Sequence, residues 1–262
     1  MGSKKRKILI IGIDSMVGKI LKLNLESCGF EVYGTSRRIY AEQNLYFLDL
    51  NSHEFELPPN FFDFAIFCAG ETSVKKCEEY YNETRKINVE NTIQLISYLT
   101  NRGVFIVFIS SNKVFDGSQP FCTPEHLTNP ITNYGRFKLE VEDYLIAKRV
   151  PSSILRLTKV LSPNSGVLEE WHHCLAKNIA INAYIDVLVS PIGLPQVAEA
   201  VFSIINSEKM GVFHLGGKFE ISYFELAKHY FKNNSEALQL INPVSSYLSR
   251  KGKHNSLSTY LP

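Results

Sequence analysis

Apolar segments alternate with helical patterns along the first 150 residues of the chain. The apolar segments cover residues 8–11, 31–36, 45–50, 63–70 and 104–111. Helical periodicity follows the first segment up to Gly29 and returns over residues 83–100 and 134–149. Because strands joined by crossover helices pair in parallel, this alternation predicts an α/β fold with a doubly wound parallel sheet.

The alternation loosens after residue 152. Residues 152–158 and 211–217 have the pattern of two further strands, and helical pieces surround Trp171, Val197 and Phe224. We therefore divide the chain into a Rossmann-type cofactor-binding domain, residues 1–160, and a smaller C-terminal substrate-binding portion, residues 161–262. We expect this portion to pack over the carboxyl edge of the sheet, with segments that return to the sheet.

The composition argues against several classes of partner. Of the 262 residues, 45% are hydrophobic and 21% are charged, and the formal net charge is only +2. We therefore expect no nucleic-acid partner and no membrane partner. No apolar run is long enough to span a bilayer, no signal peptide opens the chain, and the five cysteines lack a C-x-x-C spacing. These features favour a cytoplasmic protein with reduced thiols.

No metal site is expected. His172 and His173 are adjacent, whereas helical metal ligands are separated by three or four positions, and only Cys174 lies nearby. We interpret the histidine pair as part of a helix surface.

A glycine-containing turn follows the first strand. Gly12, Ser15 and Gly18 have the spacing G-x-x-G-x-x-G, with serine in the middle place. The first glycine permits a sharp turn, and the last permits close helix packing. The helix start at Met16 and Val17 would present unpaired N–H groups to a pyrophosphate. A plain strand-to-helix turn would use the same glycines, but the place between a strand and a helix favours a dinucleotide site.

The second strand ends in Ser36, Arg37 and Arg38. Sites selective for NAD usually carry an acidic residue here, which accepts hydrogen bonds from the ribose 2′-hydroxyl. Two guanidinium groups suit a 2′-phosphate instead. An exposed basic turn is the alternative, but together with the upstream glycines the arginines predict NADP(H) as the cofactor.

A tyrosine and a lysine lie four positions apart in "NYGRFK", at Tyr134 and Lys138. On a helix, this spacing puts both side chains on one face. A lysine ammonium beside a phenol favours the phenolate, so we expect the pKa of Tyr134 to fall below about 10. The fifth strand ends at Ser110 and Ser111, and a nearby serine hydroxyl would polarise a substrate carbonyl.

The same spacing recurs at Tyr144/Lys148 and Tyr247/Lys251. Spacing alone therefore proves little. Tyr144 lies deep in the same helix and off the face of Tyr134, and the other pair falls in an irregular segment. Since only Tyr134 follows a serine-tipped central strand, we choose it as the catalytic candidate.

Several stretches run along nearly the whole chain in one order: "ILIIGIDSMVGKIL", "DFAIFCAGETSV", "KINVENT", "FISSNKVFDG", "NYGRFKLEVE", "SPIGLPQVAEAV", "GVFHLGG" and "KHNSLST". With them the chain resembles the extended short-chain dehydrogenases/reductases. Within that family it is most similar to the nucleotide-sugar reductases typified by dTDP-4-dehydrorhamnose reductase. The resemblance implies a nucleotide-sugar substrate and leaves a homodimer open.

The resemblance also implies roles for residues beyond the glycine turn. Asp49 and Leu50 would border the adenine of the cofactor, and Cys68, Ala69 and Gly70 would border its ribose. Ser111, Tyr134 and Lys138 would form the catalytic triad of the family. Tyr134 and Lys138 would also contact the cofactor, with Lys138 on the nicotinamide ribose. Lys113, which stands where this reductase group often has tyrosine, and Phe115 would border the substrate. The position of residues 113–116 after the fifth strand, together with the resemblance, extends this prediction to Asp116 and to the region around Trp171.

Three functions remain open from the sequence. The first is NADPH-dependent reduction of a keto group on a nucleotide-linked deoxysugar. Epimerisation or dehydration is a sister reaction in this fold, but Asn112 and Lys113 offer no carboxylate of the kind that dehydration normally needs. The third function is that of a non-catalytic, regulatory NADP-binding subunit. Such a subunit would not need Ser111, Tyr134 and Lys138, so the presence of all three residues argues for an enzyme.

Overall fold

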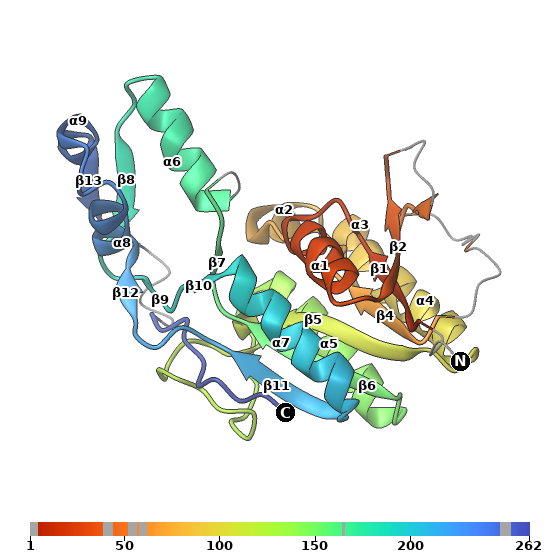
Figure 1. Ribbon diagram of the computed structural model, residues 1–262. Helices are drawn as coiled ribbons and strands as arrows, with labels where there is room; N and C mark the ends of the chain where they lie inside the picture. Colours follow the sequence, from red (N-terminus) through yellow and green to blue (C-terminus); the bar gives the residue numbers. More distant parts are fainter. Residues whose placement is uncertain (1–4, 39–43, 52–56, 58–61, 164–165, 247–252) are drawn as a thin grey trace.

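A seven-stranded parallel sheet forms the centre of the protein. The computed structural model describes residues 5–38, 44–51, 57, 62–163, 166–246 and 253–262. Within them the strands are ordered β11-β6-β5-β4-β1-β2-β3, and each pairs with its neighbours in parallel (Figure 1). They are β1 (Lys7–Ile11), β2 (Glu31–Ser36), β3 (Leu45–Phe47), β4 (Phe64–Phe67), β5 (Phe105–Ser111), β6 (Ser152–Leu157) and β11 (Gly211–Leu215). The predicted doubly wound sheet is confirmed, with every predicted strand in it.

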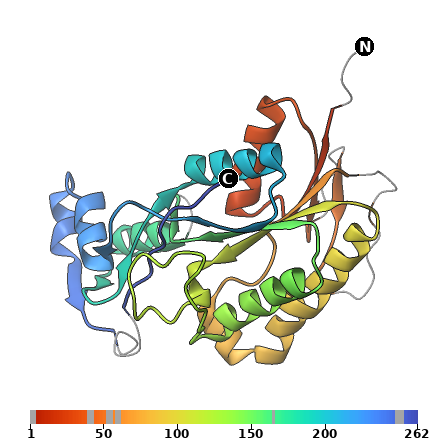
Figure 2. The same cartoon turned by 90° about the horizontal axis from the view of Figure 1, so that it is seen from below.

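Helices cover both faces of this sheet. Figure 2 shows α1 (Met16–Ser27) and α7 (Leu194–Ser207) on one face, with α4 (Asn91–Thr100) and α5 (Asn133–Ala147) on the other. The short helices α2 (Val74–Glu79) and α3 (Tyr81–Arg85) lead into a π-helical turn, η1 (Lys86–Glu90), which continues into α4. A 3₁₀ turn, η2 (Asn112–Val114), follows β5.

The first strand explains why the sheet needs two helical layers. Ile8 and Ile10 belong to the core under α1 and α7, whereas Leu9 and Ile11 belong to the core under α4 and α5. All four side chains are fully buried. Because successive side chains of a strand point to opposite faces, an unbroken apolar run requires cover on both sides.

A smaller lobe extends from the carboxyl edge of the sheet (Figure 1). It contains α6 (Gly166–Ala176), α8 (Tyr223–Tyr230), α9 (Ser235–Gln239) and the parallel pair β8 (Ile181–Tyr184) and β13 (Ile241–Val244). Its own apolar core surrounds the buried Trp171. Two short pairs connect it to the sheet: β7 (Val160–Leu161) with β10 (Ile192–Gly193), and β9 (Leu188–Val189) with β12 (Ile221–Ser222).

Two negative findings apply to the described ranges. None of the helices in them has the length and apolar character needed to cross a bilayer. Nor do three or more His, Cys, Asp or Glu side chains of these ranges meet in a group that could hold a metal ion. His172 and His173 are exposed on α6, where His172 packs against Tyr230.

Candidate active site

Two cavities adjoin at the carboxyl edge of the sheet, and Thr72 lines both of them. The first, of about 280 Å³, lies over the ends of β1, β2 and β4. The second, of about 920 Å³, lies between the sheet and the smaller lobe. Strands β2 and β4 flank β1, so the first cavity occupies the point where the strand order reverses, as ligand sites do in doubly wound folds.

The first cavity brings together most of the predicted cofactor residues. Those in its wall are Gly12, Ser15, Ser36, Arg37, Asp49, Leu50, Cys68, Ala69 and Gly70. The other residues predicted to bind the cofactor are not among its lining residues: Met16, Val17, Gly18, Arg38, Tyr134 and Lys138. Sequence reasoning missed Asp14, Thr35, Leu48, Glu71, Thr72 and Ile87, which also line it. All of these except Ile87 lie within two positions of a predicted residue. Ile87 is therefore the one among them that no neighbouring prediction would have pointed to.

The chemistry of this wall fits a dinucleotide. Ser15 is the N-cap of α1, and its hydroxyl accepts a hydrogen bond from the Gly18 N–H at 3.0 Å. No acidic residue occupies the first turn of α1, so its positive end is not neutralised there. Arg37 lines the same cavity, while the exposed Arg38 has its Nε 4.0 Å from the Asp14 carboxylate.

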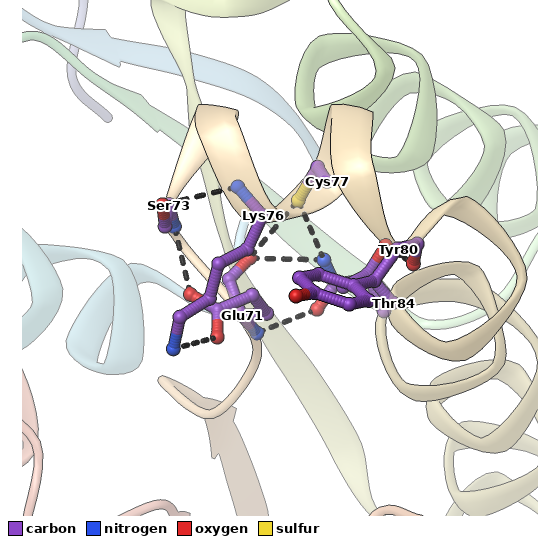
Figure 3. A network of polar contacts seen from close by, with 7 residues as sticks. Glu71, Ser73, Lys76, Cys77, Tyr80 and Thr84 are labelled. Atoms are coloured by element: carbon purple, nitrogen blue, oxygen red, sulfur yellow. Dashed lines mark hydrogen bonds and ion pairs between the residues drawn. The ribbon is translucent and has the colours of Figure 1, made fainter.

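A hydrogen-bond network fixes the segment that runs between the two cavities (Figure 3). The Asn88 amide, from the π-helical turn, donates to the Glu71 carbonyl at 2.9 Å and accepts from the Glu71 N–H at 2.8 Å. The Glu71 carboxylate accepts from the Ser73 N–H at 2.9 Å and from Lys76 Nζ at 3.1 Å. Burial alone would raise the pKa of Glu71, but these two hydrogen bonds hold it below its ordinary value. The segment is therefore fixed by the Glu71 side chain and by Asn88 of the π-helical turn.

The structure brings Ser111 and Tyr134 together. Ser111 ends β5 and caps η2, where its hydroxyl accepts from the Lys113 N–H at 3.2 Å. Tyr134 lies in the first turn of α5, and its hydroxyl approaches the Ser111 side chain closely enough for Ser111 to lower the pKa of Tyr134. Gly135 permits this approach, because a Cβ there would lie 2.1 Å from the Lys113 carbonyl oxygen. The glycine inside "NYGRFK" thus lets the helix approach the end of the strand.

Lys138 lies one turn further along α5, but its ammonium does not set the pKa of Tyr134. Lys138 Nζ donates to the Ile109 carbonyl at 2.8 Å and lies 6.0 Å from the centre of the Tyr134 ring. Burial raises the pKa of Tyr134 to about 12, against the opposing effect of the Ser111 side chain. The predicted lowering is therefore wrong: the desolvated phenol stays protonated. Burial also lowers the pKa of Lys138 to about 8.

The rival tyrosine of α5 is not in this site. Tyr144 packs into the apolar core between the sheet and the helices α4 and α5, and Lys148 is an exposed residue at the C-cap. The pair Tyr247/Lys251 lies outside the described residues.

The second cavity contains the side chains predicted to border the substrate. Lys113, Phe115 and Asp116 line it from the loop after β5, and Trp171 lines it from α6. Glu170, beside Trp171, lines it too. Lys159 and Asn255 also line this cavity, and sequence reasoning missed them. They come from two distant segments, so only the folded chain brings them together.

The seven-stranded parallel sheet, with a cavity at its switch point and a helix terminus beside that cavity, defines a Rossmann-type α/β protein. The match to known proteins is more specific. The chain belongs to the family described as RmlD substrate binding domain, which matches residues 6–257. The resemblance to nucleotide-sugar reductases of the extended short-chain dehydrogenase/reductase family is thereby confirmed.

Individual relatives agree with this family. A dTDP-4-dehydrorhamnose reductase of Sinorhizobium fredii is 29% identical over 179 residues, which are 64% of this chain and 60% of that protein. Methionine adenosyltransferase 2 subunit beta of Bos taurus is 27% identical over 162 residues, covering 58% of this chain and 46% of the relative. The chain thus spans about half of the length of these relatives.

A solved structure extends the similarity over the whole chain. The dTDP-4-dehydrorhamnose reductase of Bacillus anthracis, in complex with NADP, superposes with a TM-score of 0.81. The match covers 99% of this chain and 91% of that one, at 20% identity. At this identity the comparison establishes the fold.

Proposed function

We propose that this protein is an NADPH-dependent reductase of a keto group on a nucleotide-linked deoxysugar. The observation that carries the proposal is the approach of Tyr134, in the first turn of α5, to Ser111 at the end of β5, with Lys138 one helical turn away. These three residues are not among the lining residues of either cavity, but they lie near both. Lys138 is close enough to Cys68, in the wall of the first cavity, for the two side chains to affect each other's pKa, and Lys113 and Thr132 of the second cavity are two residues from Ser111 and Tyr134. A cofactor in one cavity and a sugar in the other would meet at these side chains.

Each side chain has a distinct task in this proposal. Bound NADPH would supply the hydride to the carbonyl carbon. Tyr134 would give its proton to the carbonyl oxygen, and a pKa of about 12 keeps that proton in place until charge develops on the oxygen. The Ser111 hydroxyl would donate a hydrogen bond to the same oxygen. The ammonium of Lys138 would hold the cofactor ribose and stabilise the phenolate that forms.

The choice of NADPH rests on Arg37. This residue lines the first cavity next to Ser36 at the end of β2, where a 2′-phosphate would lie, and a guanidinium binds phosphate with charge-assisted hydrogen bonds. The Bacillus anthracis relative, crystallised with NADP, supports the same cofactor.

Tyr134→Phe tests the proposal, because it removes one hydroxyl and leaves the ring packing intact. We expect steady-state NADPH oxidation on an accepted keto-sugar nucleotide to fall by a factor on the order of 10²–10⁴, with unchanged cofactor affinity. Tyr144→Phe is the matched control in the same helix and should keep full turnover. Parental activity in Tyr134→Phe would exclude the catalytic assignment.

A second candidate is a non-catalytic NADP(H)-binding subunit. It is favoured by the similarity to the beta subunit of methionine adenosyltransferase 2. A panel of keto-sugar nucleotides separates the two functions: NADPH binding without any NADPH consumption across the panel would favour the subunit.

A further inference from the structure

Two lysine side chains line the second cavity beside the catalytic candidates. Lys113 belongs to η2, and Lys159 follows β6. Both are partly withdrawn from water, and burial lowers the pKa of each, that of Lys113 to about 8. The two ammonium groups lie close enough for Lys159 to lower the pKa of Lys113 further.

The acidic groups of the cavity do not neutralise Lys113. The Asp116 carboxylate accepts from the Ser118 N–H at 2.8 Å and from Asn129 Nδ2 at 3.1 Å. Glu170 interacts with Lys159. Among the described residues, no carboxylate oxygen lies within 4.0 Å of Lys113 Nζ.

The partner that Lys113 does have is neutral. Its Nζ donates to the amide oxygen of Asn255, whose own Nδ2 donates to the Leu188 carbonyl at 2.9 Å. Because a desolvated ammonium with a neutral acceptor keeps most of its charge uncompensated, the cavity attracts an anion. Coulomb attraction in such a site is stronger than in water.

We propose that Lys113, assisted by Lys159, binds an anionic oxygen group of the substrate next to the reacting carbonyl. Hydrogen bonds connect the Lys113 ammonium to Ser111: Asn255 Oδ1 accepts from Lys113 Nζ and from Asn112 Nδ2, and Asn112 Oδ1 accepts from the Ser111 hydroxyl. An anion at this lysine would therefore lie near the serine that would polarise the carbonyl. The group is a carboxylate on the sugar or a phosphate of the nucleotide. This inference rests on the proposed function, since it places the sugar of that reaction in the second cavity.

The test is calorimetric binding of UDP-glucuronate, UDP-glucose and dTDP-glucose to the protein with NADPH present. If the anion is a sugar carboxylate, UDP-glucuronate binds about tenfold or more tightly than UDP-glucose, and Lys113→Gln removes this preference. If it is a nucleotide phosphate, the ligands that bind all weaken by about tenfold in Lys113→Gln, with no preference for glucuronate.

Two control variants separate the effect of removing the Lys113 charge from a general effect of substitution on the fold. Lys113→Arg keeps the cation and should retain anion binding, whereas Lys177→Gln changes an exposed lysine outside the cavity and should bind as the parent does. Equal binding by the parent and a folded Lys113→Gln would overturn the inference, and so would failure of the parent to bind any of the three ligands at millimolar concentration. Binding, not turnover, is the readout here, because none of the three ligands carries a keto group. Charge-dependent binding of these ligands, with no NADPH oxidation on the panel of keto-sugar nucleotides, would reject the reductase and keep the anion site.

Discussion

Gly70 and Asn88 make one close contact that positions the segment between the two cavities. Gly70 has φ +143°, and a Cβ at this position would lie 2.8 Å from Asn88 Oδ1. The same oxygen accepts the Glu71 N–H. Any side chain at residue 70 would therefore strain the backbone and displace the amide that holds Glu71.

Gly70→Ala should consequently weaken both folding and cofactor binding. Backbone strain of this kind costs about 1–3 kcal/mol, and displacement of Asn88 adds to it. Urea unfolding and NADPH titration measure the two effects. Gly29→Ala is the control, because Gly29 also has a positive φ of +89°, but a Cβ added there would meet no described neighbour within 4 Å. Equal losses in the two variants would show that the contact with Asn88 contributes nothing.

Sequence reasoning at this scale found residue positions better than it found their electrostatics. The order of Ser111, Tyr134 and Lys138 along one strand and one helix places them near each other in any doubly wound sheet. The pKa of Tyr134 depends instead on burial and on where the Lys138 ammonium points, which the chain around "NYGRFK" does not encode. The hydrogen-bond partner of Lys113 could not be predicted from the sequence either, because Asn255 lies 142 residues away.

At the scale of elements, the carboxyl ends of β1, β2 and β4 each supply a different part of the proposed cofactor site. Strand β1 leads into the start of α1, β4 leads into residues 68–70, and β2 ends at the two arginines. Of the arginines, Arg37 lines the cavity, whereas the side chain of Arg38 is 76% exposed and faces Asp14. The two guanidinium groups should therefore contribute unequally.

Arg37→Ala should weaken NADPH binding by about 1.5–3 kcal/mol, the contribution of a charge-assisted hydrogen bond, and leave NADH binding nearly unchanged. Arg38→Ala should have a smaller effect, because exposed ion pairs are screened by water. Calorimetric titration of both cofactors measures the difference. Equally tight NADH and NADPH binding by the parent protein would contradict the preference for a 2′-phosphate.

The strands of the central sheet and the main helices could be predicted from the sequence, whereas the two-residue strands could not. All seven strands of the sheet carry apolar runs that two helical layers require, and α6, α7 and α8 contain the predicted Trp171, Val197 and Phe224. The two-residue strands β7, β9, β10 and β12 form only because distant segments meet. The continuous helix predicted over residues 83–100 is interrupted by the π-helical turn, which carries Asn88 toward Glu71.

At the scale of the whole molecule, a buried polar cluster joins four separate segments. Arg156 of β6 donates to the Glu142 carboxylate of α5 at 2.6 Å, and both side chains are almost fully buried. His214 of β11 lies 3.3 Å from the Arg156 guanidinium through Nε2 and 3.1 Å from the Cys122 carbonyl through Nδ1. Since a guanidinium can only donate, Nε2 accepts and the imidazole is neutral.

This cluster predicts a loss of stability in mild acid. Burial, reinforced by Arg156, lowers the pKa of His214 from 6.5 to about 4. The unfolded chain therefore binds a proton below pH 6.5 that the folded protein does not, so stability falls as the pH drops from 6.5 toward 4. Between pH 7 and pH 5 the contribution of His214 is on the order of 2 kcal/mol.

Urea unfolding at the two pH values measures this effect. His214→Gln should lose less stability on acidification than the parent does, by about that amount. His173→Gln, on the exposed side of α6, should follow the parent. The same pH dependence in all three proteins would exclude His214 as its source.

The pairing of α1 with α7 also determines the order in which this protein can fold. Arg6, just before β1, donates to Glu208 at 3.0 Å and to Asn206 at 2.9 Å, at the end of α7. These contacts close a loop of about 200 residues, and such closure costs chain entropy before any contact is gained. The face of the first strand that packs under α1 and α7 therefore stays only partly covered until α7 arrives from far along the chain, which favours slow folding and leaves apolar surface open to aggregation in the meantime.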